Sequence, residues 1–319
     1  MGAGQPPPRA RYRRSIALPY ARLLIFPIVF LTACLAVAKT FDESPAHLVL
    51  SRVMELERDL DAKAGLFVYD IESKEVIAHR ADERFPLNST FKLFACAALL
   101  ARVEEGTSRL DAKIDLDPRD LVAWSPSVEA FIAEGRGSAS LDELCAAMLA
   151  KSDNTAANLV LKEIGGPKGF TAYLRAIGDS VTRLDRWEPE LNEGLPDDPR
   201  DTTTPRAIAA SLETLLLGDS LTPASREKLR RWLSGHVIAD DLFRSVLPKG
   251  WSIDDRTGAG DCGTRGIVAV IYPPSRGPIV AVTYFRDAKV SLEERNRAIA
   301  RVGQAIVTHF QTEWSKTPR

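Results

Sequence analysis

Strand-like segments lie near both ends of the chain, and this arrangement limits the folds that are open to it. Residues 65–70 and 76–79 are short, apolar runs around a polar turn, and residues 267–272 and 279–285 have the same character. The long stretch between them, from Ser89 to about Leu233, reads as mostly helical. We therefore predict an α/β (α+β) fold in which both ends share one sheet and a helical block is inserted.

Helical patterns flank the strands and fill the middle of the chain. Apolar side chains recur at helical spacing in residues 44–64 and again in residues 291–310. Residues 95–100 are apolar on every side, which predicts a helix buried at the centre of its domain.

The N-terminus has the layout of an export signal. Residues 1–38 contain five arginines and no acid, and an apolar run at residues 23–31 is followed by small residues. That run is short and contains Pro27, so it does not predict a membrane span. We expect a signal peptide over residues 1–38, a mature domain over residues 39–319, and a location in the bacterial periplasm.

Two processing sites stay open for this signal. The sequence A-V-A at residues 36–38 would allow cleavage that releases a soluble protein, whereas the lipobox-like run ending at Cys34 would give a lipid-anchored one. The arginine pair at residues 13–14 also allows twin-arginine export.

The charge balance bears on possible partners. The chain has 42 basic and 43 acidic residues, and without the five arginines of the signal its formal charge is −6. A general nucleic-acid binder would be expected to carry a basic face, so this class is disfavoured.

A hydroxyl and an amine lie three residues apart in the sequence Ser89-Thr90-Phe91-Lys92, where a run of helix-forming residues begins. On a helix they share a face. A serine hydroxyl is a poor nucleophile until a base takes its proton, and Lys92 would serve if burial and nearby cations lower its pKa. The alternative is a helix cap followed by a solvated lysine.

A second candidate is Ser152-Asp153-Asn154, which separates two apolar helical stretches. Such a turn can direct a hydroxyl and an amide into a cleft. Ser, Asp and Asn are also the usual helix-capping residues, so capping of the following helix is the alternative.

The chain then enters a long loop, from Arg186 to about residue 205, that is rich in proline and acidic residues. Long irregular loops are often functional. Glu188 and Asn192 could hold a water between them and take its proton, and Arg186 and Asp201 could close the loop with an ion pair. A solvated acidic loop is the alternative.

A cation and a hydroxyl stand beside small residues at Arg256-Thr257-Gly258-Ala259-Gly260, just ahead of a strand. They can bind a carboxylate while a main-chain N–H faces an oxyanion, and Arg265 can add a second cation. The alternative is a glycine-rich turn leading into the strand.

Cys96, Cys145 and Cys262 follow the signal. Cys96 lies seven residues after Ser89 and Cys145 seven before Ser152, so a bridge between them would join two motif-bearing helices. We favour that bridge over any pairing with Cys262, and three reduced cysteines are the alternative. The Cys and His spacings do not resemble a zinc site.

In their order and separation, these motifs resemble those of the class A serine β-lactamases: S-x-x-K, S-D-N, E-x-x-L-N and K-T-G. The resemblance runs from about residue 44 to the C-terminus. It implies a β-lactamase/transpeptidase-like fold, with an antiparallel-sheet subdomain (about 39–85 and 236–319) and an all-helical subdomain (about 86–235). Trp124 matches an aromatic residue that walls the family's site, and Cys96 and Cys145 match a disulfide found in many members.

The resemblance also implies roles for individual residues. Ser89 would attack the lactam carbonyl, with the N–H groups of Ser89 and Ala259 holding the oxyanion, and Ser152 would pass a proton to the ring nitrogen. Glu188, with Asn192 and Lys92, would activate the deacylating water; either Lys92 or Glu188 would be the acylation base. The substrate contacts would come from Trp124, Asn154, Asn192, Arg256, Thr257, Gly258 and Arg265.

Arg256 departs from the family's K-T-G lysine, and arginine is not equivalent to lysine at such a site. It resembles the carbenicillin-hydrolysing branch, so we expect a penicillinase of narrow spectrum that accepts carboxypenicillins and confers resistance. Position 88 is asparagine, where some carbapenem-hydrolysing members have a disulfide cysteine. Position 260 is glycine, where some extended-spectrum members have a serine. We expect a monomer that binds a small β-lactam, with no nucleic acid, metal or organic cofactor.

Two other functions share most of this pattern. A penicillin-binding D,D-carboxypeptidase or transpeptidase would have the serine, lysine and K-T-G-like elements but no deacylating carboxylate. A non-hydrolytic β-lactam sensor would have the fold without an intact catalytic set. Glu188 and Asn192 favour hydrolysis over both.

Overall fold

The computed structural model describes residues 45–235 and 238–316, all within one compact unit, Asp42–Arg319. The helices are α1 (Pro45–Asp59), α2 (Phe91–Glu104), α3 (Pro126–Ala133), α4 (Leu141–Ala150), α5 (Asn154–Glu163), α6 (Gly166–Ala176), α7 (Pro205–Leu216), α8 (Pro223–Ser234) and α9 (Leu292–Lys316). The strands are β1 (Lys63–Asp70), β2 (Val76–His79), β3 (Phe85–Pro86), β4 (Lys113–Asp115), β5 (Ser138–Ser140), β6 (Thr202–Thr203), β7 (Ser252–Ala259), β8 (Arg265–Tyr272) and β9 (Ile279–Arg286). Short 3₁₀ turns are η1 (Asn88–Thr90), η2 (Pro118–Asp120), η3 (Glu190–Asn192) and η4 (Phe243–Val246).

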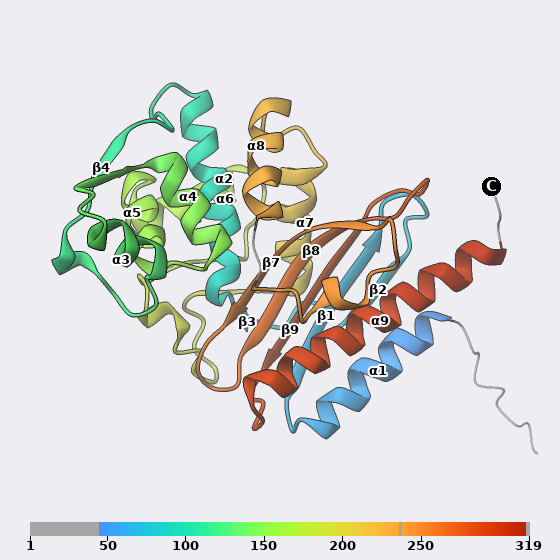
Figure 1. The fold of residues 1–319 in the computed structure, drawn as a ribbon. Helices are drawn as coiled ribbons and strands as arrows, with labels where there is room; N and C mark the ends of the chain where they lie inside the picture. Colours follow the sequence, from blue (N-terminus) through green and yellow to red (C-terminus); the bar gives the residue numbers. More distant parts are fainter. Residues whose placement is uncertain (1–44, 236–237, 317–319) are drawn as a thin grey trace, which may run out of the picture. The chain divides into compact units, whose positions relative to one another are not determined.

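The main sheet joins the two ends of the chain, as the sequence predicts. Its five strands are all antiparallel and run in the order β2-β1-β9-β8-β7. β1 pairs with β9 from Lys63 opposite Arg286 to Asp70 opposite Ile279. The helical block between them is drawn in green and yellow in Figure 1. The predicted mixed α/β fold, with an antiparallel sheet from both ends, is confirmed.

Strand β7 differs from the sequence expectation for its segment. We weighed residues 256–260 as a glycine-rich turn ahead of a strand, but residues 256–259 lie inside β7 and pair with β8. Asp and Gly are poor strand formers, so the local signal is weak. These residues nevertheless form a strand, because β7 pairs with β8 along its whole length.

Each face of the sheet has its own hydrophobic core. α1 and α9 run along one face and cover it, as Figure 1 shows. The opposite face packs against α7 and continues into the helical block. α9 extends to Lys316, beyond the predicted end at residue 310, and its last turns place Trp314 against Phe310 and Trp251.

Helix α2 lies at the centre of the helical block, as its uniform apolarity predicts. Every residue from Phe91 to Leu100 is buried. A disulfide joins Cys96 of α2 to Cys145 of α4, and Cys262 is an exposed free thiol. The favoured pairing is therefore confirmed, and the alternative of three reduced cysteines is wrong.

The predictions for residues 1–38, namely the signal peptide, its two processing sites and Cys34, lie outside the described residues. Among the helices of residues 45–235 and 238–316, none is both long and apolar enough to cross a membrane.

Candidate active site

The candidate nucleophile, Ser89, lies in η1, directly before α2, and is largely buried. Oγ of Ser89 accepts a hydrogen bond from Oγ of Ser152 at 2.9 Å. Lys92 follows one turn later, and its Nζ donates to the carbonyl oxygen of Ser152 at 2.8 Å and to its Oγ at 3.2 Å. Ser152 therefore links the amine to the nucleophile.

Lys92 is fully buried, with 0% of its surface exposed. Burial lowers the pKa of Lys92 to about 8, and the positive charge of Arg256 acts in the same direction. The carboxylate of Glu188, with Oε1 3.0 Å from Nζ, acts against them and raises this pKa. The alternative of a solvated lysine is wrong, and the predicted cause of a lowered pKa is present.

The capping interpretation of the Ser152-Asp153-Asn154 turn is confirmed for Asp153, while Ser152 contacts Ser89 and Asn154 contacts Lys92. Asp153 caps α5: its Oδ1 accepts from N of Ala156, while Oδ2 accepts from the N–H groups of Ser127 and Val128. Ser152 has a left-handed backbone, with φ of 60°. The cap anchors the turn and leaves Ser152 beside Ser89.

Asn154 is engaged by the protein at both ends of its carboxamide. Its Oδ1 accepts from Nζ of Lys92 at 2.6 Å, and Nδ2 donates to the carbonyl of Ala123 at 2.8 Å. Its backbone N–H donates to the carbonyl of Trp124. Trp124 itself is 66% exposed and held by a bond from Nε1 to the carbonyl of Lys151. An exposed ring in this position can form a wall for a ligand.

Glu188 reaches the site from the long loop and is 2% exposed. Its Oε2 accepts from Nδ2 of Asn192 at 2.5 Å. Its Oε1 lies 3.0 Å from Nζ of Lys92, with which it forms an ion pair, and no other donor reaches Oε1 among the residues described. The Glu188–Pro189 peptide bond is cis.

The main chain of Glu188 is held by a residue that the sequence did not single out. Asn158 of α5 accepts from N of Glu188 and donates to its carbonyl oxygen, both at 2.9 Å. The only sequence signal was a polar residue inside an apolar helical stretch. Asn296 of α9, which accepts from Nε of Arg265 at 2.8 Å, was also missed, because it lies among charged residues at the start of its helix.

The two ends of the loop are closed by the predicted ion pair. Nε of Arg186 lies 2.6 Å from Oδ2 of Asp201, and Nη1 lies 2.5 Å from Oε2 of Glu193. Oδ1 of Asp201 also accepts from the N–H groups of Asp185 and Arg186. The alternative of a solvated acidic loop is therefore wrong for these residues.

Arg256 of β7 is fully buried beside the two serines. Its Nη2 donates to Oγ of Ser152 at 2.7 Å, and Nε donates to the carbonyl oxygen of Ser89 at 3.2 Å. Burial lowers the pKa of Arg256 to about 9, which leaves the guanidinium charged at neutral pH. Arg256 thus adds positive charge directly behind the serine pair.

The rest of β7 brings main chain and a second cation to the site. A Cβ at Gly258 would lie 2.8 Å from N of Ser89, so only glycine permits this approach. Arg265 of β8 donates from Nη1 to Oγ1 of Thr257 and to the carbonyl of Gly258. Burial lowers the pKa of Arg265 to about 10. Ala259, opposite Arg265, ends the strand.

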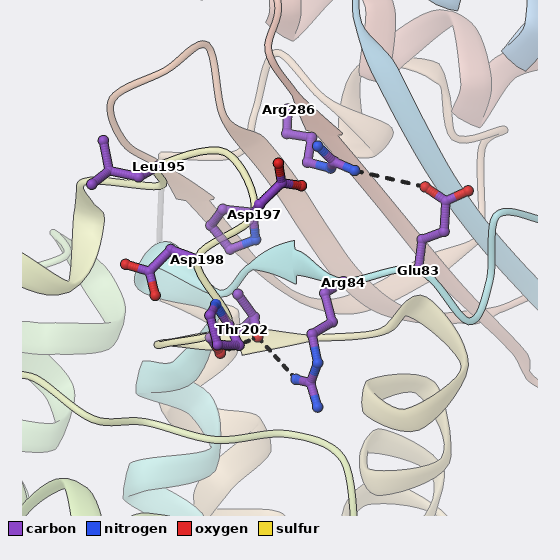
Figure 2. A pocket seen from close by; sticks show the side chains of 9 residues that line it. Glu83, Arg84, Leu195, Asp197, Asp198, Thr202 and Arg286 are labelled. Atoms are coloured by element: carbon purple, nitrogen blue, oxygen red, sulfur yellow. Dashed lines mark hydrogen bonds and ion pairs between the residues drawn. The ribbon is translucent and has the colours of Figure 1, made fainter.

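A cavity of about 280 Å³ lies on the outer side of the same loop. Leu195, Asp197 and Asp198 of the loop line it, and Figure 2 shows the carboxylate of Asp197 pointing toward Arg286 while Leu195 and Asp198 point away. Arg84 donates to Oγ1 of Thr202 at 2.9 Å, and Arg286 pairs with Glu83 at 3.7 Å. None of the predicted catalytic residues lines this cavity, so it is separate from the candidate active site.

The candidate site combines a nucleophile, a lysine of lowered pKa, a buried carboxylate and two arginines. This set suits acyl transfer to a serine, followed by hydrolysis of the ester. Within the described ranges, no group of three or more His, Cys, Asp or Glu side chains is placed to hold a metal ion.

Known proteins share this architecture. A family model described as the beta-lactamase enzyme family matches residues 49–310. An ancestral class A β-lactamase, that of the last common ancestor of Gram-negative bacteria, is 48% identical with a TM-score of 0.79, over 82% of this chain and 99% of its own. The chromosome-encoded β-lactamase of Vibrio parahaemolyticus is 44% identical with a TM-score of 0.79, over 82% and 99% of the two chains.

Fold, site and relatives together define a serine enzyme that hydrolyses β-lactams. Within that class, the chain belongs to the class A β-lactamase family.

Proposed function

We propose that the protein hydrolyses penicillins, carboxypenicillins among them, through an acyl-enzyme on Ser89, and that this activity confers resistance to these drugs. The observation that carries the proposal is the unbroken contact chain from Glu188 through Lys92 and Ser152 to Ser89. This chain supplies a nucleophile, a route for its proton and a base for water, which hydrolysis needs together.

Acylation begins with attack of Oγ of Ser89 on the lactam carbonyl carbon. The oxyanion is held by the N–H groups of Ser89 and Ala259, and the proton of Ser89 passes to Lys92 or, through a water, to Glu188. Collapse of the intermediate breaks the lactam C–N bond, and Oγ of Ser152 delivers a proton to the departing nitrogen. The positions of Lys92 and Arg256 beside Ser152 support this relay.

Deacylation needs a water that attacks the ester carbon of the acyl-enzyme. Glu188 takes a proton from that water through Oε1, which has no other hydrogen-bond donor in the described part of the chain. The ester C–O bond breaks, and Ser89 regains its proton. Asn192, bonded to Oε2, holds the second oxygen of this base.

Three side chains bind the substrate carboxylate in this proposal: Arg256, Thr257 and Arg265. Their clustering on β7 and β8 supports it, because buried Arg265 donates to the hydroxyl of Thr257 while buried Arg256 donates to the hydroxyl of Ser152. Arg256 in place of lysine supports acceptance of carboxypenicillins, as in the carbenicillin-hydrolysing branch that the sequence resembles. Trp124 and Asn154 flank the substrate side chain, and Gly258 gives it access to the edge of β7.

The two alternative functions do not account for the loop. A D,D-carboxypeptidase, a transpeptidase or a non-hydrolytic sensor has no need of a buried carboxylate beside the nucleophile, with its main chain held by Asn158 and its Oε2 by Asn192. We further propose that the enzyme acts as a monomer in the periplasm, either soluble or lipid-anchored through Cys34. Mass spectrometry of the mature N-terminus separates these two forms.

Substrate preference is tested with benzylpenicillin and carbenicillin on the purified protein and on an Arg256→Lys variant. We expect sustained hydrolysis of both by the unaltered protein. We also expect Arg256→Lys to lower kcat/KM for carbenicillin more than for benzylpenicillin, because a compact ammonium cannot reproduce the guanidinium fork. Equal losses for the two substrates would contradict the carboxypenicillin assignment.

A further inference from the structure

The residue before the nucleophile, Asn88, has a polar side chain in a buried position. It is 1% exposed, and its Nδ2 donates a hydrogen bond to Oδ1 of Asn192 at 3.4 Å. Its backbone φ is 43°, in the left-handed region that asparagine adopts more readily than most residues. Asn88 therefore connects η1, which carries the nucleophile, to η3 in the loop.

The contact with Asn88 bears on which way the carboxamide of Asn192 faces. Nδ2 of Asn192 donates to Oε2 of Glu188 at 2.5 Å and to the carbonyl of Pro189 at 3.1 Å. If this carboxamide turned over, its oxygen would face a carboxylate oxygen, which is repulsive. Nδ2 of Asn88 supplies a donor for Oδ1 at the opposite end, so Asn88 and Glu188 favour the same orientation.

The turn after β7 packs against the carboxamide of Asn88 and against the main chain of Asn192. A Cβ at Gly260 would lie 2.2 Å from Nδ2 of Asn88 and 2.5 Å from the carbonyl oxygen of Asn192. The N–H of Asp261 donates to that same carbonyl at 2.9 Å. The bare main chain at Gly260 thus packs directly on the Asn88–Asn192 pair.

The other end of the Asn88 carboxamide is not satisfied. Oδ1 of Asn88 is buried and has no hydrogen-bond partner among the residues described. Such a group lowers stability, and an apolar side chain of similar size would avoid that cost. A role for Nδ2 explains why a polar side chain occupies this position.

We propose that Asn88 is a positioning residue for deacylation. It orients Asn192, and Asn192 in turn holds Glu188, the residue that takes a proton from the attacking water. This inference rests on the roles proposed above for Glu188 and Asn192. It assigns Asn88 to the second half of the reaction, although Asn88 is the immediate neighbour of the nucleophile in the sequence.

The test measures acylation and deacylation rates separately, in pre-steady-state experiments with benzylpenicillin. Asn88→Gly removes the side chain and suits the positive φ, while Asn88→Asp keeps the shape but removes the donor. We expect deacylation to slow roughly five- to tenfold in Asn88→Gly, the effect of one neutral hydrogen bond, with acylation little changed. Asn88→Asp should slow it at least as much, because two acceptors then face each other.

The matched control is Thr90→Val, which alters the same 3₁₀ turn. The hydroxyl of Thr90 bonds to the carbonyl of Leu87 and to the hydroxyl of Tyr284, away from Asn192. We expect both rates of this variant to stay near those of the unaltered protein. Acylation and deacylation that fall together in the Asn88 variants would instead indicate a damaged nucleophile turn and would overturn the proposal.

A double-mutant cycle gives the sharper outcome. If Asn88 acts through Asn192, then Asn88→Gly should add little to the deacylation defect of Asn192→Ala. A full additional loss in the Asn192→Ala background would show that Asn88 acts by another route. Failure of the proposed hydrolytic function itself would look different, since the unaltered protein would then open one equivalent of penicillin and release no product.

Discussion

The protonation of Lys92 is set by neighbours that act in opposite directions. Burial and Arg256 lower its pKa to about 8, while the Glu188 carboxylate raises it. The neutral amine is the form that can accept a proton, so its population grows as the pH rises through that pKa. Lys92 and Glu188 are in direct contact, with Nζ and Oε1 3.0 Å apart.

Replacing Glu188 by Ala removes the influence that raises the pKa of Lys92. The pKa of Lys92 should fall further, and if Lys92 is the acylation base, the rising limb of the acylation rate should move to lower pH. Deacylation should stop, so that a mass increase on Ser89 persists. Stopped-flow acylation across pH, with mass spectrometry of the intact protein, checks both results.

A Glu188→Gln variant is the control for shape, because it keeps the side-chain volume but loses the charge. It should shift the acylation profile in the same direction as Glu188→Ala. Normal turnover in either variant would contradict the assignment of Glu188 as the deacylating base. A shift of the acylation profile to higher pH would contradict its raising of the pKa of Lys92.

At the level of single residues, the sequence predicted the side chains that carry the chemistry but not all of the residues that hold them in place. Ser89, Lys92, Ser152 and Glu188 meet in the structure, as the motif order implied. Asn158 could not be foreseen, because its bonds to the main chain of Glu188 cross 30 positions of sequence. Contacts of this kind depend on how the loop folds over α5, which no local pattern encodes.

At the level of elements, helix α2 carries both the nucleophile's turn and one half of the disulfide. Removing the bridge with Cys96→Ala and Cys145→Ala opens a loop with a sequence separation of 49. We expect the free energy of unfolding to fall by about 2–4 kcal/mol, while kcat stays near the unaltered value. Urea unfolding with parallel kinetics measures this; unchanged stability would show that the bridge does not constrain the unfolded chain.

The elements that the sequence predicted best were those with strong periodicity. α2 and α9 appear where the sequence predicted helices, and β8 and β9 match their apolar runs. α1 ends at Asp59, short of the predicted end at residue 64, because residues 63 and 64 pair with β9 as part of β1. β7 was not recognised, because its middle carries charged side chains that the site itself requires to be buried. A strand that carries functional residues departs from the apolar pattern by which buried strands are recognised in a sequence. The strand conformation of β7 is therefore apparent only from its pairing with β8.

At the level of the whole molecule, the sheet separates the core beneath α1 and α9 from the helical block with the active site. Phe310 is buried in the first core. Asn296, which supports Arg265, lies 14 residues earlier on the same helix, about 21 Å along its axis. Stability and catalysis should therefore respond separately to changes at the end of α9.

We predict that Phe310→Ala lowers the free energy of unfolding by about 3–5 kcal/mol, the usual cost of deleting a buried phenylalanine side chain. Below the unfolding transition, kcat for benzylpenicillin should match that of the unaltered protein. Phe131→Ala is a useful comparison, because Phe131 is only partly buried and should cost less. A loss of kcat in folded Phe310→Ala would show that this core communicates with the site.

The central claim is that Ser89 is acylated and then released by a water that Glu188 activates. The most direct measurement counts β-lactam rings opened per enzyme molecule when purified protein meets an excess of benzylpenicillin. The account predicts a count that continues far beyond one per enzyme molecule at a steady rate. A burst of one equivalent followed by a stop would contradict it, because it would leave a serine acylated by penicillin with no working route to hydrolysis.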